Sequence, residues 1–305
     1  MIPPKRAVSG AAKASLVYHA GALGDFITTL PALRVWRRLH ASDHITLIGK
    51  PRHAAVAGRF AAWDEVWDVE SRSLARLFRA GQDPATDPGG LSRFSSALLF
   101  SPLSSPLRRN LEALGVRGIQ WQAPFPSSPM PIIDYHLALF PDVEIAEDER
   151  IPLVDPGDPR EQPQTTASET PGPTVALHPG SGSHAKNWAF ARFQALAGEL
   201  QRRGERIAWI VGPAEEGLAL EVPGTVWRDL PLANLCAKLS TCRLYVGNDS
   251  GVTHLAAAVG APTLALFGPS DPRIWAPKGR QVRILKAQKL RDISVSEVVE
   301  VCCLL

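Results

Sequence analysis

Short apolar runs of strand length alternate with polar or helix-like stretches from Ser15 onward. Runs of this length, bounded by turn residues, are typical of strands buried on both faces, and their alternation with helices is typical of a parallel sheet. We therefore expect an α/β fold. In the first half, the predicted strands are SLVYH (15–19), HITLIG (44–49), EVWDV (65–69) and SALLF (96–100).

The same alternation restarts at residue 174. Helices are expected to begin near Ala189, to run through Glu215, to cover about 232–239, and to begin near Gly251 and Ser294. The predicted strands of this half are TVALH (174–178), RIAWIV (206–211), RLYVG (243–247), TLALF (263–267) and QVRIL (281–285). Two similar halves predict two Rossmann-like domains with parallel sheets facing a cleft.

Proline-rich and unpatterned segments set the expected domain boundaries. Residues 155–173, DPGDPREQPQTTASETPGP, have no apolar periodicity and are the best linker in the chain. Residues 1–14 are expected to be a loose tail. The first domain then covers 15–154 and the second covers 174–305, with a last helix that is able to pack back on the first domain.

Composition narrows the function classes. The chain has 305 residues, 45% of them hydrophobic, and a net charge of only +3, so it lacks the basic footprint of a nucleic-acid-binding protein. No apolar run is long enough to cross a membrane, and the four cysteines fit neither a zinc site nor a disulfide framework. We expect a cytoplasmic protein.

The stretch HAGALGDFITTLPALRVWRRL (19–39) places an acid directly after the first strand. Gly21 and Gly24 allow a tight turn and close approach to a ligand, and Asp25 lies at or just before a helix start. Asp25 is either a helix cap or a reacting carboxylate. A dinucleotide-binding fingerprint is disfavoured, because Ala22 and Ile27 stand where glycines are needed.

Two further loops follow predicted strands. In HPGSGSHAKNW (178–188), Ser181, Ser183 and Lys186 offer donors and a positive charge suited to phosphate oxygens, or simply a solvated loop. In YVGNDSGVTHLAAAVG (245–260), Asp249, Ser250 and Gly251 precede an apolar helix, whose start suits a pyrophosphate. Asp249 could instead be only a cap, and His254 only an inner histidine.

These blocks together resemble glycosyltransferase family 9, the ADP-heptose:lipopolysaccharide heptosyltransferase family. The matching segments are GALGDFITTLPALR, HPGSGSHAKNW, VGPAEE (211–216) and NDSGVTHLAAAVGAPTLALFGPSDP (248–272). The resemblance implies a GT-B-like fold. It also implies an inverting glycosyltransferase that moves a sugar, such as heptose, from an ADP-sugar to a lipopolysaccharide or other cell-envelope glycan or glycolipid.

By the same resemblance, Asp25 is the catalytic base, and Lys186 stabilises the departing nucleotide. The resemblance also predicts donor-binding residues, which are Ser181, Ser183, Lys186, Glu215 or Glu216, Asp249, Ser250, Gly251 and His254. No cofactor or metal is expected, since D-x-D, H-E-x-x-H and C-x-x-C are missing from the sequence. Peripheral contact at the inner face of the cytoplasmic membrane is compatible with such acceptors.

Two alternative functions stay open at this point. The first is a non-catalytic sugar-nucleotide or glycan-binding subunit, which the presence of Asp25 and Lys186 disfavours. The second is an NAD(P)-binding Rossmann oxidoreductase, which the incomplete glycine pattern disfavours.

Overall fold

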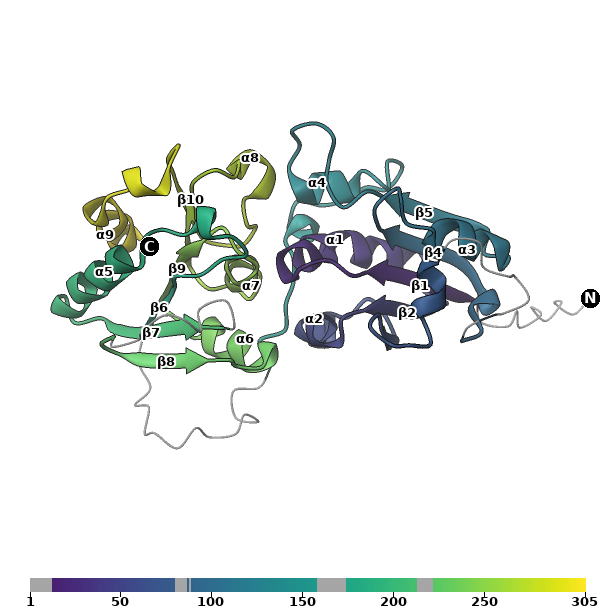
Figure 1. Cartoon of the computed structure of the whole chain (residues 1–305), viewed down its shortest axis with the longest axis horizontal. Coiled ribbons are helices and arrows are strands. Elements are labelled where there is room, and N and C mark those ends of the chain that lie inside the picture. The colour runs from purple at the N-terminus through teal and green to yellow at the C-terminus, as the bar shows by residue number, and fades with distance from the viewer. Residues whose placement is uncertain (1–12, 80–86, 88, 158–173, 213–221) are drawn as a thin grey trace, which may run out of the picture. The chain divides into compact units, whose positions relative to one another are not determined.

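The first of two parallel sheets is formed by the amino-terminal part of the chain. The structure, a computed structural model, describes residues 13–79, 87, 89–157, 174–212 and 222–305 (Figure 1). The strands of the first sheet are β1 (Ala14–His19), β2 (His44–Gly49), β3 (Glu65–Asp68), β4 (Phe94–Phe100) and β5 (Gly118–Gln122). Their order is β3-β2-β1-β4-β5, and every pairing is parallel.

The second sheet is formed by the carboxy-terminal part of the chain. Its strands are β6 (Thr174–His178), β7 (Arg206–Val211), β8 (Thr225–Arg228), β9 (Leu244–Asn248), β10 (Thr263–Phe267) and β11 (Val282–Lys286). Their order is β11-β10-β9-β6-β7-β8, again with parallel pairing throughout. The predicted α/β class with two parallel sheets is therefore confirmed.

Helices connect the strands, as parallel pairing requires. They are α1 (Leu23–Leu39), α2 (Pro51–Ala54), α3 (Leu107–Ala113), α4 (Ile132–Leu137), α5 (Phe190–Arg202), α6 (Leu232–Ser240), α7 (Gly251–Ala258), α8 (Pro272–Trp275) and α9 (Val295–Leu304). Within the described ranges, no helix has both the length and the apolar character needed to cross a membrane.

Contacts divide the chain into two compact units. Of the described residues, the first unit holds 13–20, 34–50 and 62–123, and the second holds 21–33, 51–61 and everything from 124 onward. The first sheet lies in the first unit and the second sheet in the second. The predicted boundaries at 154 and 174 stay predictions, since residues 158–173 lie outside the described ones.

Each unit has its own apolar core. In the first, Leu16 and Leu99 of the sheet pack with Leu111 of α3. In the second, Leu177 and Val246 pack in a larger cluster that also takes in buried side chains of α5 and α9. The sequence left open whether the last helix packs back on the first domain, and α9 buries Val298, Val299 and Cys302 in the core of the second unit.

Several elements differ from their sequence predictions. Ala14, expected in the tail, is the first residue of β1, and β4 begins two residues before the predicted run. The sequence did not predict β5, β8 and the short helices α2, α3, α4 and α8. The predicted helix through Glu215 lies outside the described residues.

The strand orders contain one reversal in each sheet. In the second sheet, the chain builds outward from β6 to β7 and β8, then returns to the other side of β6 for β9, β10 and β11. In open parallel sheets, ligands bind outside the carboxyl ends of the strands at such a reversal. The loops after β6 and β9 are therefore where a site is expected.

Candidate active site

An ion pair joins the loops that follow β6 and β9. Lys186 lies in the 3₁₀ helix η6 (His184–Lys186), and its Nζ is 2.7 Å from Oδ2 of Asp249, the residue directly after β9. The Asp249 side chain is 8% exposed and that of Lys186 is 38% exposed. The buried carboxylate thus holds a partly accessible ammonium at the strand reversal.

Asn248, the last residue of β9, fixes the loop that carries Lys186. Its Nδ2 donates to the carbonyl of Pro179 at 2.7 Å, and its Oδ1 accepts from the amide of Trp188 at 2.9 Å. One buried amide therefore bonds both ends of the HPGSGSHAKNW loop, so the position of Lys186 depends on β9 rather than on its own segment alone.

Ser250, and not Asp249, caps helix α7. The Ser250 hydroxyl accepts from the amide of Thr253 at 3.3 Å, and the Ser250 backbone is extended. The alternative of Asp249 as only a helix cap is therefore wrong, because its carboxylate lies against Lys186 instead. The start of α7, with its positive dipole end, lies directly beside that pair.

A buried network of hydroxyls and one imidazole supports Ser250. The Tyr245 hydroxyl lies 3.0 Å from the Thr253 hydroxyl, and both Tyr245 and Ser250 are 3.3 Å from Nδ1 of His178. Burial lowers the pKa of His178 to about 4, so its imidazole is neutral at pH 7. The network therefore holds no net charge beneath the helix start.

His254 lies on α7 and is also buried. Burial lowers its pKa to about 4, against an opposing effect of Asp249 that raises the pKa. A neutral imidazole next to the Lys186–Asp249 pair can donate or accept a hydrogen bond, but it adds no charge at pH 7.

Asp25 lies in the first turn of α1. The amide of Ala22, the residue before the helix, donates to Oδ2 of Asp25 at 3.2 Å. This bond caps the start of the helix. Asp25 therefore does act as a cap, through its Oδ2 atom. Capping also fixes the direction of the carboxylate.

Gly24 and Gly251 allow the starts of α1 and α7 to meet within the second unit. A Cβ added at Gly251 would lie 3.0 Å from the Gly24 nitrogen, and one added at Gly24 would lie 3.3 Å from the His254 ring. Residues 21–33, which include Gly24, belong to the second unit. The sequence analysis noted Gly24 for close approach to a ligand, and Gly251 only as a residue at a helix start suited to a pyrophosphate.

A cavity of about 510 Å³ in the second unit brings most of the predicted site residues together. Of the site residues predicted from the sequence, the following line this cavity: Asp25, Ser183, Lys186, Asp249, Ser250, Gly251 and His254. Ser181 is not among the lining residues. Glu215 and Glu216 lie outside the described residues, so the choice between them stays open.

Ser181 is used inside its own loop. Its hydroxyl lies 2.6 Å from Oδ1 of Asn187 and 2.8 Å from the carbonyl of Ser183, and it accepts from the Ser183 amide. The predicted contact of Ser181 with donor phosphates stays a prediction. In this structure the hydroxyl braces the turn that presents Ser183 and Lys186.

The cavity also has lining residues that the sequence analysis did not select. Thr28, Phe125, Ser270 and Trp275 contribute to its wall. Ser270 lies at the end of the family-matching segment 248–272, directly after a predicted strand, and this was the available signal. Phe125 and Trp275 lie in loop-like parts of the sequence that are far apart along the chain. No local pattern therefore predicted that they line one cavity.

A second cavity, of about 370 Å³, lies at the ends of β6, β7 and β8. Its wall includes His178, Trp227 and Leu235, and it includes Asp229, whose φ of 47° is in the left-handed region. Non-glycine residues adopt this conformation mainly where surrounding structure enforces it, often at ligand sites. His178 links the two cavities, because its Nδ1 contacts Ser250.

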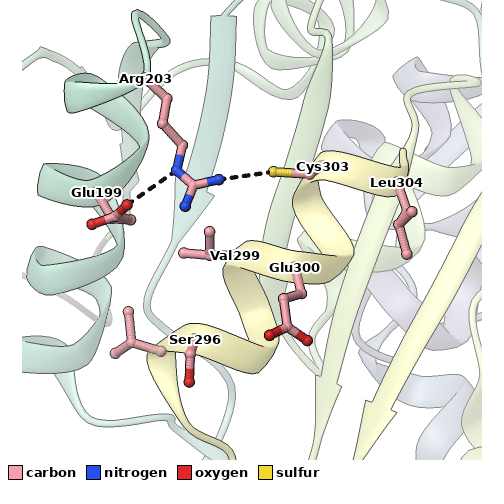
Figure 2. A pocket seen from close by; sticks show the side chains of 8 residues that line it. Glu199, Arg203, Ser296, Val299, Glu300, Cys303 and Leu304 are labelled. Carbon is pink, nitrogen blue, oxygen red and sulfur yellow. Dashed lines mark hydrogen bonds and ion pairs between the residues drawn. The ribbon is translucent and has the colours of Figure 1, made fainter.

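A third cavity, of about 630 Å³, lies along α5 and α9, and none of the predicted site residues lines it (Figure 2). Figure 2 shows Arg203 between Glu199 and Cys303, at 3.0 Å and 3.2 Å respectively. The guanidinium is thus already engaged. Among the residues that the structure describes, no group of three or more His, Cys, Asp or Glu side chains could hold a metal ion.

Comparison with known proteins supports the resemblance seen in the sequence. Lipooligosaccharide heptosyltransferase 2 of Haemophilus influenzae is 27% identical over 180 residues, covering 52% of each chain. The match therefore spans about half the length of that curated relative.

Two solved structures share the fold over nearly the whole chain. The glycosyl transferase family 9 protein of Veillonella parvula has a TM-score of 0.74 at 18% identity, covering 96% of this chain and 97% of that one. The heptosyltransferase WaaC of E. coli, solved with ADP, has a TM-score of 0.67 at 16% identity, covering 94% and 98%. Similarity at these identities concerns the fold, which is of the GT-B type.

The family profile described as glycosyltransferase family 9 (heptosyltransferase) matches residues 92–300, well over half of the sequence. This range includes β6, β9, Lys186 and Asp249, whereas Asp25 precedes it. The chain therefore belongs to glycosyltransferase family 9.

Proposed function

We propose that the protein is an inverting glycosyltransferase that transfers heptose from an ADP-heptose donor to a lipopolysaccharide or other cell-envelope glycan. The observation that carries the proposal is the Lys186–Asp249 pair beside the start of α7, in a cavity that Asp25 also lines. Relatives named as heptosyltransferases, and a fold neighbour solved with ADP, support the choice of donor.

The donor diphosphate is proposed to lie between Lys186 and the start of α7. An ammonium and a helix amino terminus both favour anions, and the hydroxyls of Ser183 and Ser250 add hydrogen bonds. Asp249 keeps Lys186 in place while the ammonium stays partly accessible. The adenine is proposed to enter the cavity lined by Trp227 and Leu235, which His178 joins to the phosphate site.

Asp25 is proposed as the general base. The acceptor hydroxyl oxygen forms a bond to the anomeric carbon as the bond from that carbon to the ADP oxygen breaks. The proton of the hydroxyl passes to the Asp25 carboxylate, and ADP leaves with the bonding electron pair. Attack from the side opposite the leaving group inverts the configuration, and Lys186 and the α7 dipole stabilise the charge that develops on ADP.

Metal independence is part of the proposal, because Lys186 and α7 supply positive charge where a metal ion would otherwise be used. We expect transfer activity to persist in EDTA. Loss of activity in EDTA that added divalent metal restores would contradict this part alone.

Nucleotide selectivity tests the proposal before any acceptor is identified. We expect ADP to raise the melting temperature of the wild type more than UDP, GDP or NAD(P) does, because bound ligand stabilises the folded state. Lys186→Ala should reduce the ADP shift, and Lys289→Ala, at an exposed lysine outside the lining of both cavities, is the matched control. Stabilisation by NAD(P) alone would favour the oxidoreductase alternative.

A transfer assay with ADP-heptose separates an enzyme from a binding subunit. We expect the wild type to release ADP in the presence of a lipopolysaccharide acceptor. Binding of ADP-heptose without any ADP release, across several envelope glycans, would support the non-catalytic alternative instead.

A further inference from the structure

Two aromatic side chains meet at the wall of the 510 Å³ cavity. Phe125 follows β5, Trp275 ends α8, and their ring centroids are 5.6 Å apart with the planes at 78°. Phe125 is 56% exposed. In an edge-to-face pair, the ring that offers its edge keeps both of its faces uncovered by its partner. An aromatic face is thus available beside the cavity.

Besides this aromatic pair, the cavity wall holds charged and polar side chains, such as those of Asp25, Lys186 and Asp249. A sugar ring fits such a wall, because it has hydroxyls at its edge and a face of C–H groups that packs on an aromatic ring. A nucleotide base would also stack on an aromatic ring. The separate cavity at Trp227 offers the base an apolar site of its own.

Ser270 adds an unused polar group at the same wall. Its hydroxyl oxygen is buried, and it has no hydrogen-bond partner among the described residues. Lys286 of β11 donates to the backbone carbonyls of Gly268 and Ser270, the latter at 2.9 Å, and so holds the turn in place. A buried hydroxyl without a partner is unfavourable, and a ligand hydroxyl would supply one.

We propose that Phe125, Trp275 and Ser270 form a sugar-ring subsite, in which an aromatic face packs against the C–H face of a sugar and Ser270 bonds one of its hydroxyls. The inference rests on the proposed function and goes beyond it by naming the residues that recognise the sugar. The ring is either the one transferred from the donor or the one that accepts it, and the two sources give different results below.

Calorimetric titration of ADP and of ADP-heptose into the full-length protein tests the subsite. Trp275→Ala should leave the Kd of ADP within about twofold and raise the Kd of ADP-heptose about two- to tenfold, if the subsite holds the transferred sugar. If it holds the accepting sugar, both Kd values stay unchanged, and the KM for a lipopolysaccharide acceptor rises by the same factor. Ser270→Ala should act in the same direction.

Controls separate recognition from folding. Trp275→Phe keeps an aromatic face and should restore most of the affinity that Trp275→Ala loses. If the loss came only from disturbed packing, the smaller Phe side chain would not restore the affinity. Leu304→Ala removes an exposed apolar side chain of α9, outside this cavity, and should change none of the constants. Thermal unfolding of Trp275→Ala verifies that the variant is folded.

The contradicting outcomes are distinct. If Trp275→Ala weakens ADP as much as ADP-heptose, the rings contact the nucleotide, and the sugar subsite is wrong. If the variants change neither ADP-heptose affinity nor the acceptor KM while ADP still binds, the subsite is also wrong and the proposed function stands. A wild type that binds neither ADP nor ADP-heptose contradicts the proposed function, and the subsite with it.

Discussion

Each unit contains a buried asparagine that joins separate backbone segments, and the two differ in what they hold. In the first unit, Nδ2 of Asn110 on α3 donates to the carbonyls of Leu77 and Arg79, at 2.7 Å and 3.0 Å. In the second, Asn248 bonds both ends of the loop that carries Lys186. The same amide chemistry stabilises a peripheral segment in one unit and a candidate active-site loop in the other.

The loops after the two sheets also differ in how much polar chemistry they carry. After β6 and β9, the second sheet presents an ion pair, a capped helix start and two buried neutral histidines. The segment after β1 of the first sheet supplies one carboxylate, that of Asp25 in the first turn of α1. We expect this difference if the loops of the second sheet bind the donor and Asp25 removes the proton. The variants below test that division.

Removal of the single carboxylate should have the largest effect. Asp25→Asn keeps an oxygen that can accept from the Ala22 amide, but it cannot take a proton, so we expect kcat to fall about 10²- to 10⁴-fold. The Kd of ADP, which we propose to bind at the loops of the second sheet, should stay within about twofold. Asp142→Asn, at an exposed acid, is the matched control. A kcat within a few-fold of wild type would exclude Asp25 as the base.

The two asparagines can be compared directly. Asn248→Ala leaves the Pro179 carbonyl and the Trp188 amide without their partner, and we expect the free energy of unfolding to fall by about 2–4 kcal/mol. Asn110→Ala should destabilise by a similar amount, because two carbonyls lose the same donor. Urea denaturation measures both losses.

Only Asn248→Ala should also weaken ADP binding, by about tenfold or more, since it releases the loop that positions Lys186. Asn110→Ala should leave the ADP affinity unchanged. Equal ADP affinity in both variants would show that the loop position does not depend on Asn248.

The buried histidine beneath α7 predicts a pH dependence of stability. The pKa of His178 is lowered to about 4 in the folded protein, from about 6.5 when unfolded. Below about pH 6.5 the unfolded chain therefore binds a proton that the folded protein excludes, so stability is lost as the pH falls toward 4. At pH 5 this amounts to about 2 kcal/mol.

His178→Asn keeps an acceptor for the Tyr245 or Ser250 hydroxyl but cannot titrate. The variant should lose less stability than wild type between pH 7 and pH 5 in urea denaturation, by about 2 kcal/mol. The same pH dependence in both proteins would mean that the imidazole charges in the folded state without a penalty.

The sequence predicted the central strands well because each is a continuous apolar run buried on both faces, as β9 and β10 are throughout. The missed strands β5 and β8 are at sheet edges, where partial exposure breaks the apolar pattern. Helices α3 and α4 have only seven and six residues, too few for a helical period of apolar positions to stand out. Their patterns were therefore too weak to be distinguished from loops.

The sequence by itself determined the α/β class, the motif-bearing loops after three predicted strands, and the resemblance to the family. These features are local, because strand length, turn glycines and apolar runs can be read from neighbouring residues. The contacts across the chain came only from the tertiary structure, which pairs Lys186 with Asp249 over 63 positions and Phe125 with Trp275. The order of strands in a sheet decides which loops meet, and no local pattern encodes that order.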